Sequence, residues 1–492
     1  MLKASRIDIA AWTSLAAALL LAGCATAPVP APQPAVPLSA AFHGAGPAEP
    51  EASLASRWWA TFGDTTLVAL VERALQDNHD IAAALQRVQA ARAGVDAQAS
   101  RWWPAVAMQA EAARSSSGLP PAVKQGQPDT RALRLGVPLS WELDLAGGLR
   151  AARDAAAAEA RAAADGVAGA RLLVASEVAR QYYLWRGAEE RLALVAALAA
   201  AQHETARLVQ TRWREGQSST FDLDRARAEA EAFDALLPPL RTLSGVSRHR
   251  LAVLVGADPS RPLVTPDAAF AWPQPRAVAP GQPSELLQRR PDLRAAEARF
   301  VAASLRGQEA RAQWWPRLFL GAVAGRQDLQ LNALDLAPVR YGSVSLALAL
   351  PLFTAGRIEA GVQAQSARAE EALQAWQHAL LVAVQEVEDS LLAQAQERQR
   401  AERLQATLAH RQRSLQHAQR LQAEGQVDLL VLLDVQRSVL AAELACSETR
   451  LQQQLDAVQL FKALGGGYDT QAAGIEGPAP ARPSRTAERS SP

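Results

Sequence analysis

Two stretches of this chain, 209 residues apart, are near-copies of each other and limit its fold more than any other feature. They read EGQSSTFDLDRARAE at residues 215–229 and EGQVDLLVLLDVQRS at residues 424–438. Each carries a glycine, Gly216 or Gly425, that can take the left-handed turn which ends a helix. In the second stretch Asp428 stands where its side chain can cap the next helix. A chain that builds the same helical hairpin twice is predicted to consist of two structural repeats.

The first repeat, residues 56–255, passes from helix to strand and back to helix. Short helices precede Trp102-Trp103-Pro104, where proline ends the helical pattern. Apolar residues then occupy every second position from Leu133 to Leu143, which predicts a strand with one apolar face. We expect strands over about 104–114 and 131–144, then long helices over about 149–214 and 220–255. The first long helix would measure roughly 100 Å at the helical rise per residue.

The second repeat, residues 284–467, follows the same order, and its short helix also ends in a Trp-Trp-Pro sequence, Trp314-Trp315-Pro316. The expected elements are a helix over about 284–313, strands over about 317–326 and 341–353, and long helices over about 357–424 and 428–464. Residues 256–283 contain seven prolines and are predicted to link the repeats. Residues 468–492 are predicted to be a disordered tail.

The first 23 residues have the pattern of a signal peptide. A basic start precedes the apolar run Ala10–Ala22, which is too short to cross a bilayer. The run ends in Leu21-Ala22-Gly23-Cys24, which resembles a bacterial lipobox. That resemblance implies cleavage before Cys24 and acylation of Cys24, and several acyl chains would anchor the protein stably. The alternative is an ordinary signal peptide with a chance cysteine. Residues 24–55 are predicted to be an extended Pro/Ala-rich tether.

No later stretch reaches 18 consecutive apolar residues, so no transmembrane helix is expected. A chain of this kind can span a membrane only as a closed β-barrel. Four strands cannot close a barrel, and open strand edges cannot face lipid, so the chain must oligomerise. Three copies would supply twelve strands. The predicted fold class is mainly α with a membrane β-barrel, each protomer giving four β-strands and two long α-helical hairpins.

Composition and motifs exclude several classes of function. The 51 basic and 50 acidic residues are interleaved along helices and give a formal charge of +1, so no nucleic-acid partner is expected. The seven histidines are scattered without an HExxH motif or a Cys/His cluster, so no metal or cofactor site is expected. No GxSxG motif occurs. We therefore predict no catalytic residue and no enzymatic activity, and we interpret Cys446 as a small helix-packing residue.

The sequence resembles the TolC/OprM outer membrane efflux protein family, and within it the lipoprotein branch that includes NodT-like members. The resemblance covers about residues 56–468. It rests on a combination of motifs: Trp58-Trp59 with Phe62 and Asp64, Arg289-Arg290-Pro291-Asp292-Leu293, the Trp-Pro ends of the short helices, and Asp434-Val435-Gln436-Arg437 in the second hairpin. Members of the family form homotrimers with a 12-stranded β-barrel in the bacterial outer membrane and a periplasmic α-barrel.

The resemblance also implies a function and partners. Family members are passive exit ducts that receive drugs or other toxic small molecules from an inner-membrane pump, here of the RND type, through a periplasmic adaptor protein. Ala25 follows Cys24 and no aspartate signals inner-membrane retention, so the family resemblance implies the outer membrane. Two other interpretations stay open: a type I secretion duct for polypeptides, and a lipid-anchored periplasmic coiled-coil scaffold. The sequence does not identify the cargo.

The resemblance places Leu430, Asp434 and Arg437 at a gate that constricts the periplasmic end of the tunnel. These residues share one helix face. A threefold ring of Asp434 carboxylates would repel itself unless water, a cation or Arg437 compensated the charge. The alternative is an exposed helix face with an ordinary i, i+3 ion pair. By the same offset the first hairpin has Phe221 and Arg225, so one hairpin alone carries the acidic ring.

The two hairpin tips are candidates for adaptor docking, because both are small and polar around one glycine. They comprise Glu215, Gly216 and Gln217 in the first hairpin and Glu424, Gly425 and Gln426 in the second. The alternative is that they are merely tight turns.

Overall fold

The computed structural model describes residues 29–44, 57–116, 118, 120, 129–261, 263, 270–273, 279–331 and 334–466. The expected lipidation site Cys24 and the expected tail at 468–492 lie outside these residues. The chain divides into two compact units. We call the described parts of Met1–Ala35, Gln86–Ala163 and Arg294–Ala379 the sheet unit, and those of Val36–Leu85, Ala164–Leu293 and Leu380–Pro492 the helical unit.

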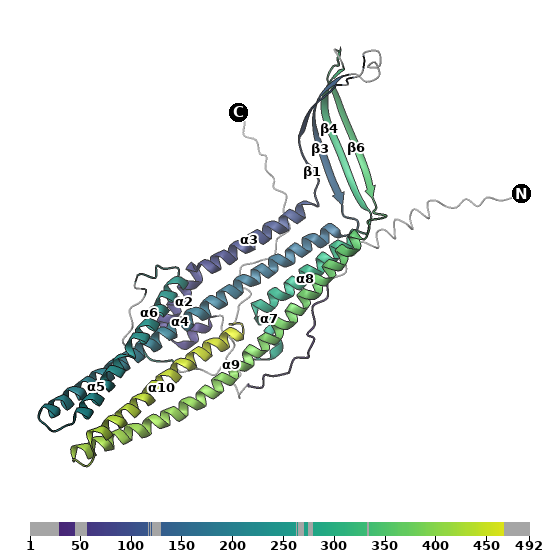
Figure 1. The fold of residues 1–492 in the computed structure, drawn as a ribbon. Coiled ribbons are helices and arrows are strands. Elements are labelled where there is room, and N and C mark those ends of the chain that lie inside the picture. Colours follow the sequence, from purple (N-terminus) through teal and green to yellow (C-terminus); the bar gives the residue numbers. More distant parts are fainter. Residues whose placement is uncertain are drawn as a thin grey trace, which may run out of the picture. The chain divides into compact units, whose positions relative to one another are not determined.

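Helices account for most of the described chain (Figure 1). In chain order they are η1 Trp58–Phe62, α2 Thr65–Asp77, α3 His79–Ser100, α4 Gly148–Arg214, α5 Thr220–Asp234, α6 Leu237–Leu254, η3 Pro283–Glu285, α7 Leu286–Arg289, α8 Pro291–Ala312, α9 Arg357–Ala423 and α10 Leu429–Ala463. Two of them, α4 and α9, have 67 residues each. In the described part of the chain, no helix has both the length and the apolar character needed to cross a bilayer.

Two helices that the sequence analysis treated as continuous are interrupted. The return helix expected over 220–255 is divided at residues 235–236 into α5 and α6, and Pro238 and Pro239 lie in the first turn of α6. Proline has no amide hydrogen and its ring clashes with the preceding turn, so it is tolerated at a helix start and breaks a helix interior. The helix expected over 284–313 is divided at Arg290 for the same reason, since Pro291 opens α8 and forces Arg290 into an extended conformation.

The sheet unit contains one antiparallel sheet. Its strands are β1 Ala105–Val106, β2 Gln109–Ser115, β3 Thr130–Leu143, β4 Arg317–Leu331, β5 Leu334–Asp335 and β6 Val339–Ala349. Both β1 and β2 pair with β3, β3 pairs with β4, and β4 pairs with β6. The strand expected over 104–114 is thus broken in two. The strand expected to reach 353 ends at Ala349, two residues before Pro351, which cannot donate to a ladder.

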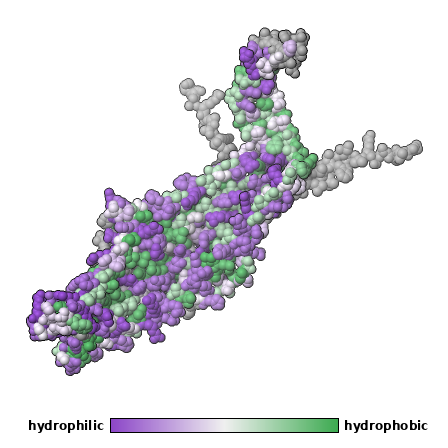
Figure 2. All heavy atoms as spheres, in the orientation of Figure 1, coloured by the Kyte–Doolittle hydropathy of each residue, from purple (hydrophilic) through white to green (hydrophobic). Residues whose placement is uncertain are grey.

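The two faces of this sheet differ in composition. Rows of partners such as Leu143 with Leu318, and Leu318 with Leu348, lie on one face, which we call the apolar face. Alternate rows carry Ser140, Gly321 and Ser345 on the other, polar face. In Figure 2 hydrophobic residues cover much of the visible sheet, and hydrophilic residues gather at the end where β2 and β3 are joined. The alternation predicted from the sequence therefore gives a sheet with one apolar side.

Aromatic residues form the core of the helical unit. The rings of Trp58 and Phe461 stack with centroids 5.1 Å apart, so the first helical turn, η1, packs against the last turns of α10. Tyr182 and Tyr183 of α4 are both nearly fully buried in the same cluster. The Tyr182 hydroxyl donates to Asp64 Oδ2 at 2.7 Å. Asp64 Oδ1 also accepts from the amides of Thr66 and Leu67, and so caps the start of α2.

The expected tether has no helix or strand over residues 29–44, where bends occur at 35–36 and 40–41, and its end at residues 42–44 packs against a helix. Phe42 is 3 % exposed, and the amides of His43 and Gly44 donate to the two carboxylate oxygens of Glu388 on α9, at 2.8 and 3.1 Å. A Cβ at Gly44 would lie 2.8 Å from the Cβ of Leu391, so the backbone itself packs against α9. This segment is therefore part of the helical unit.

Candidate functional site

The two hairpin tips have the same backbone geometry. Gly216 and Gly425 have φ angles of +72° and +73°, which glycine adopts without strain. The next amides, of Gln217 and Gln426, each donate at 2.8 Å to a carbonyl five residues back, which closes the helix end. The exposed tip residues expected to dock a partner are Glu215, Gly216, Gln217, Glu424, Gly425 and Gln426. The repeated sequence therefore builds a repeated turn.

The two hairpins differ in how the returning helix begins. Ser219 caps α5 with a reciprocal capping box, because its hydroxyl accepts from the Asp222 amide and Asp222 accepts from the Ser219 amide. The hydrogen bonds from Ser219 hold the pKa of Asp222 below its usual range. Asp428 occupies the equivalent position before α10, but its side chain makes no capping hydrogen bond. The prediction that the Asp428 side chain caps α10 is therefore wrong, although Asp428 does occupy the N-cap position.

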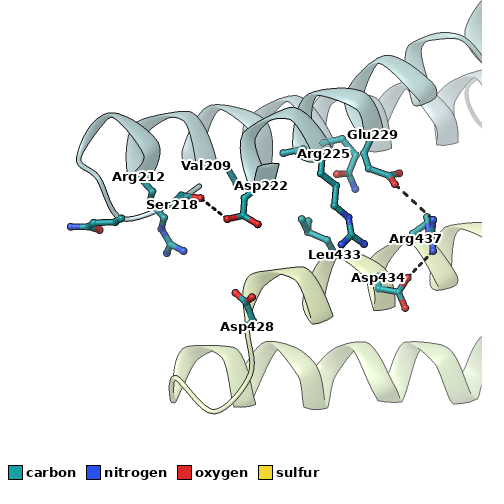
Figure 3. Close-up of a pocket in the computed structure, with 13 residues that line it drawn as sticks. Val209, Arg212, Ser218, Asp222, Arg225, Glu229, Asp428, Leu433, Asp434 and Arg437 are labelled. Atoms are coloured by element: carbon teal, nitrogen blue, oxygen red, sulfur yellow. Dashed lines mark hydrogen bonds and ion pairs between the residues drawn. The ribbon is translucent and has the colours of Figure 1, made fainter. Parts of the chain in front are cut away.

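An ionic chain connects α10 to the first hairpin, as Figure 3 shows. Arg437 Nη2 donates to Asp434 Oδ1 at 2.7 Å, and Arg437 Nη1 lies 3.8 Å from Glu229 Oε1 on α5. The side chains of Arg437 and Asp434 are 56 % and 60 % exposed. The structure thus brings Asp434 and Arg437 together and adds Glu229, which sequence reasoning missed. Leu430 lies in the first turn of α10, but its side chain is outside the described residues.

A cavity of about 250 Å³ lies between the two hairpins at this point. Its lining is strongly charged, with four acidic and three basic side chains: Asp222, Glu229, Asp428, Asp434, Arg212, Arg225 and Arg437. In Figure 3 Arg225 extends from α5 toward α10. Arg225 is the residue that the 209-residue offset placed opposite Asp434. The arrangement can exclude or admit ions by charge, and its contacts can be exchanged at low cost because the groups are solvated.

Apolar contacts hold the hairpins together away from the tips. Ala206 and Val209 of α4 pack against Leu223 and Ala226 of α5. A second small cluster joins Ala199, Phe233 and Leu440, and so connects the first hairpin with α10. The tips are therefore polar, and the packing that fixes the hairpins lies one or more turns away.

Two adjacent glutamates of α4 fix that helix between the two return helices. Glu189 accepts a hydrogen bond from Ser244 of α6 at 2.5 Å. Glu190 accepts from Ser447 and Arg450 of α10 at 2.5 and 2.6 Å. No sequence pattern indicated these contacts, since neighbouring glutamates on a helix usually face solvent.

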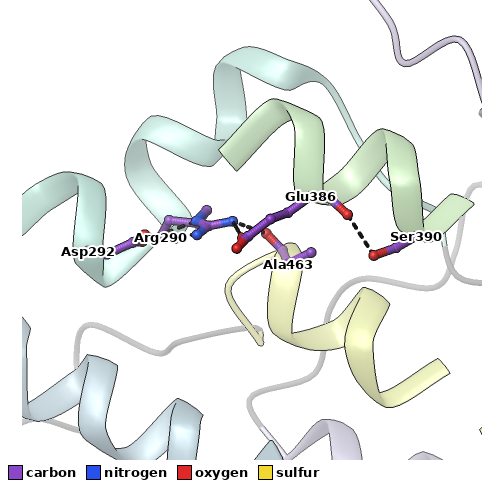
Figure 4. A network of polar contacts seen from close by, with 5 residues as sticks. All are labelled: Arg290, Asp292, Glu386, Ser390 and Ala463. Atoms are coloured by element: carbon purple, nitrogen blue, oxygen red, sulfur yellow. Dashed lines mark hydrogen bonds and ion pairs between the residues drawn. The ribbon is translucent and has the colours of Figure 1, made fainter. Parts of the chain in front are cut away.

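The segment Arg289–Leu293 forms a second polar network, seen in Figure 4. Arg290 Nη1 donates to Glu386 Oε2 on α9 at 2.6 Å and to the Ala463 carbonyl of α10 at 3.1 Å. Its Nε and Nη2 donate to the two oxygens of Asp292 at 3.1 and 2.8 Å. Burial would lower the pKa of Arg290, but the contacts with Asp292 and Glu386 outweigh burial and raise it.

The first repeat contains a counterpart of this network. Asn78 precedes α3 as Arg290 precedes α8, and Asn78 Nδ2 donates at 2.9 Å to the carbonyl of Leu254, the last residue of α6. Arg290 donates in the same way to Ala463, the last residue of α10. The two repeats thus tie corresponding helix ends together with different side chains.

Within the residues that the structure describes, no group of three or more His, Cys, Asp or Glu side chains could hold a metal ion. The buried thiol of Cys446 is free, and burial raises its pKa, so it remains protonated at neutral pH. The charged side chains that line the cavity between the hairpin tips make its chemistry ionic.

Comparison with known proteins gives consistent results. A family model described as outer membrane efflux protein matches residues 70–257 and 282–466, which are parts of both repeats. The pyoverdine export outer membrane protein OpmQ of Pseudomonas putida is 33 % identical over 421 residues, covering 84 % of this chain and 88 % of that protein. Outer membrane protein OprJ of Pseudomonas aeruginosa is 30 % identical over 476 residues, covering 93 % of this chain and 96 % of that protein.

A solved structure supports the same relationship. The outer-membrane channel OprN superposes with a TM-score of 0.77 at 29 % sequence identity, and the match covers 89 % of this chain and 99 % of that chain. The order of strands and long helical hairpins described above is therefore that of a known channel fold.

Proposed function

The chain belongs to the outer membrane efflux protein family, and on that premise we propose that it is the outer membrane channel of an efflux system. It conducts drugs or other toxic small molecules passively, and an inner-membrane pump, of the RND type, supplies them through a periplasmic adaptor. The observation that carries the proposal is the family match over both repeats, together with the near-complete superposition on a solved channel.

A homotrimer provides the channel. In the described sheet β6 pairs with β4 alone, and β1 and β2 pair with β3 alone, so both edges are free to pair with other copies. Side chains of the apolar face on β6 are strongly exposed, with Val344 at 79 % and Leu346 at 67 %. Three copies would close these edges into a 12-stranded β-barrel in the outer membrane, and the long hairpins would form an α-barrel in the periplasm.

The gate of the channel lies at the second hairpin. In a trimer, three Asp434 carboxylates face one narrow opening, and each is partly neutralised by its own Arg437 at 2.7 Å. Because both side chains are more than half exposed, each ion pair contributes at most about 1 kcal/mol. Arg437 also reaches Glu229 of the first hairpin, so the closed tip is held by contacts that are individually weak. A partner that binds the open tip needs to supply only a few kcal/mol to open it. Leu430 would add an apolar ring.

The adaptor docks on the two hairpin tips. Glu215 to Gln217 and Glu424 to Gln426 are all exposed, and both turns have the same conformation. One adaptor element could therefore recognise both tips, which would give the trimer six docking places with the same turn conformation. Phe221, which is 70 % exposed in the first turn of α5, offers an apolar contact beside the first tip.

Lipid on Cys24 anchors the chain in the outer membrane. From Cys24 to His43 the chain can extend at most roughly 65 Å. The contacts of Phe42, His43 and Gly44 with α9 fix the far end of that tether on the helical unit. The anchor and the helical unit are thus connected by a segment of limited length.

The proposal is tested by efflux in cells. Deletion of the gene should raise the accumulation of a small fluorescent cationic dye, and expression of the wild-type chain should restore the low level. Cys24→Ser expressed at the same level separates lipidation from conduction, because it should lose acylation and retain the barrel. Unchanged dye accumulation, combined with loss of a secreted polypeptide, would overturn small-molecule efflux in favour of a secretion duct. Loss of neither activity would favour the scaffold.

A further inference from the structure

Four arginines lie on the apolar face of the sheet, near the end where β2 and β3 are joined. In the register of the strands Arg114 is directly opposite Arg131, and Arg326 is directly opposite Arg340. Arg131 and Leu139 lie on the same face of β3, and Arg326 and Leu318 lie on the same face of β4, because an even number of residues separates each pair. Arg114 and Arg340 are the direct partners of Arg131 and Arg326, so they share this face. All four are exposed. The apolar face therefore ends in two rows of positive charge.

Like charges directly opposite each other destabilise a sheet. On the polar face the arginines have acidic partners: Arg134 lies 3.9 Å from Glu111, and Arg317 binds Glu142 at 2.7 Å. On the apolar face Arg326 has Asp328 at 3.4 Å. In the part of the chain that the structure describes, no acid lies within ion-pair distance of Arg114, Arg131 or Arg340. Three of the four arginines thus lack the compensation found on the opposite face.

The position of the two rows matches the edge of a membrane. From Leu318 to Arg326 is eight residues along β4, or roughly 27 Å at the rise of an antiparallel strand. With the usual tilt of about 40° this distance corresponds to about 21 Å of height, and the row of Arg131 lies about 10 Å farther. Membrane barrels carry an apolar band about 25 Å tall. The two rows therefore lie on either side of the level where such a band ends.

We propose that Arg114, Arg131, Arg326 and Arg340 bind the phosphate groups of an anionic lipid whose headgroups surround this end of the sheet. Arginine suits this role because its planar guanidinium donates two parallel hydrogen bonds to one phosphate. An open hollow of about 540 Å³ lies beside the outer row and is lined by Arg114, Arg131 and Leu133, with Asp328 as its acidic member. A phosphate between two opposed arginines would remove their repulsion. The inference rests on the proposed function, because it requires this sheet to lie in a membrane.

The test uses a matched pair of double variants. Arg131→Gln with Arg326→Gln removes one arginine from each row, on β3 and β4. Arg134→Gln with Arg317→Gln removes two charges from the same strands but from the polar face. The purified full-length proteins, in neutral detergent, are titrated with bisphosphorylated lipid A, with its monophosphorylated form and with phosphatidylcholine, and bound lipid is counted by native mass spectrometry.

We expect the wild-type protein to bind the bisphosphorylated lipid most tightly. The apolar-face variant should bind it at least ten-fold more weakly, since each basic side chain contributes about a five-fold factor at an anionic lipid surface. The polar-face variant should bind as the wild type does. Equal losses in the two variants, or equal binding of all three lipids by the wild-type protein, would overturn the inference. If a variant fails to assemble, the binding of the three lipids by the wild-type protein alone tests the inference. Channel activity of the wild-type preparation is recorded separately, so a failure of the proposed function is distinguishable from a failure of lipid binding.

Discussion

Replacement of Arg290 should destabilise the junction of α8, α9 and α10 far more than its single charge suggests. Arg290 is 8 % exposed and makes four hydrogen bonds (Figure 4). In Arg290→Met the buried Ala463 carbonyl loses its side-chain donor, which costs about 1–3 kcal/mol. The lost contact with Glu386, a third exposed, costs about 1–2 kcal/mol. Asp292 is half exposed and contributes less than about 1 kcal/mol. The expected total is about 3 kcal/mol.

Amide hydrogen exchange of the assembled wild-type and variant proteins measures this loss directly. We expect Arg290→Met to increase the exchange rate at the last turn of α10, around residues 459–466, by roughly two orders of magnitude, which corresponds to about 3 kcal/mol of local stability. Arg290→Lys retains the charge but lacks the planar fork that binds both carboxylates. Its exchange rate at the last turn of α10 should therefore lie between those of the wild type and Arg290→Met. Arg289→Gln is the matched control, because Arg289 forms only a partly exposed pair with Glu285. Equal effects of the Arg290→Met and Arg289→Gln changes would refute the reasoning.

Two further predictions concern the hairpin and the core. Ser219→Ala should remove the capping box of α5 and cost about 1 kcal/mol, seen as faster exchange at the amide of Asp222, whereas Asp428→Ala should change exchange at the start of α10 little. Asp456→Asn should raise the melting temperature at neutral pH and lose this advantage as the solution is acidified. Burial raises the pKa of Asp456, so its contribution to stability is present at low pH, where it is protonated, and is lost as pH rises through its folded-state pKa. An advantage for Asp456→Asn that is independent of pH would contradict this explanation.

The sequence predicted what depends on local patterns. The long helices α4 and α9 follow from sustained apolar periodicity, and the two tips follow from a single glycine in each. The alternation from Leu133 to Leu143 likewise identified β3. These features are determined by residues close in sequence, so a single sequence is sufficient to predict them.

Contacts between distant segments could not be predicted in this way. The ties from Asn78 to Leu254 and from Arg290 to Ala463 join residues more than 170 positions apart. No spacing rule indicates such pairs. The repeat offset paired Asp434 with Arg225, whereas the structure gives Arg437 a partner one helical turn farther along α5, at Glu229. Glu229 is the last residue of the first copy of the repeated stretch. The sequence therefore contained this acidic residue near the tip, but nothing in it indicated that Arg437 would be its partner.

Single-channel conductance of the purified protein in planar bilayers tests the central claim most directly. The wild-type protein should give small, cation-preferring currents, because in the proposed trimer three Asp434 carboxylates would line a narrow tip. Arg437→Gln should enlarge the currents clearly, since it removes both the neutralising partner of Asp434 and the contact with Glu229. Arg207→Gln is the control, because Arg207 forms the same kind of i, i+3 pair, with Glu204, away from the cavity. The absence of any channel from correctly assembled protein would contradict the channel itself. Equal currents from wild type and Arg437→Gln would contradict the gate.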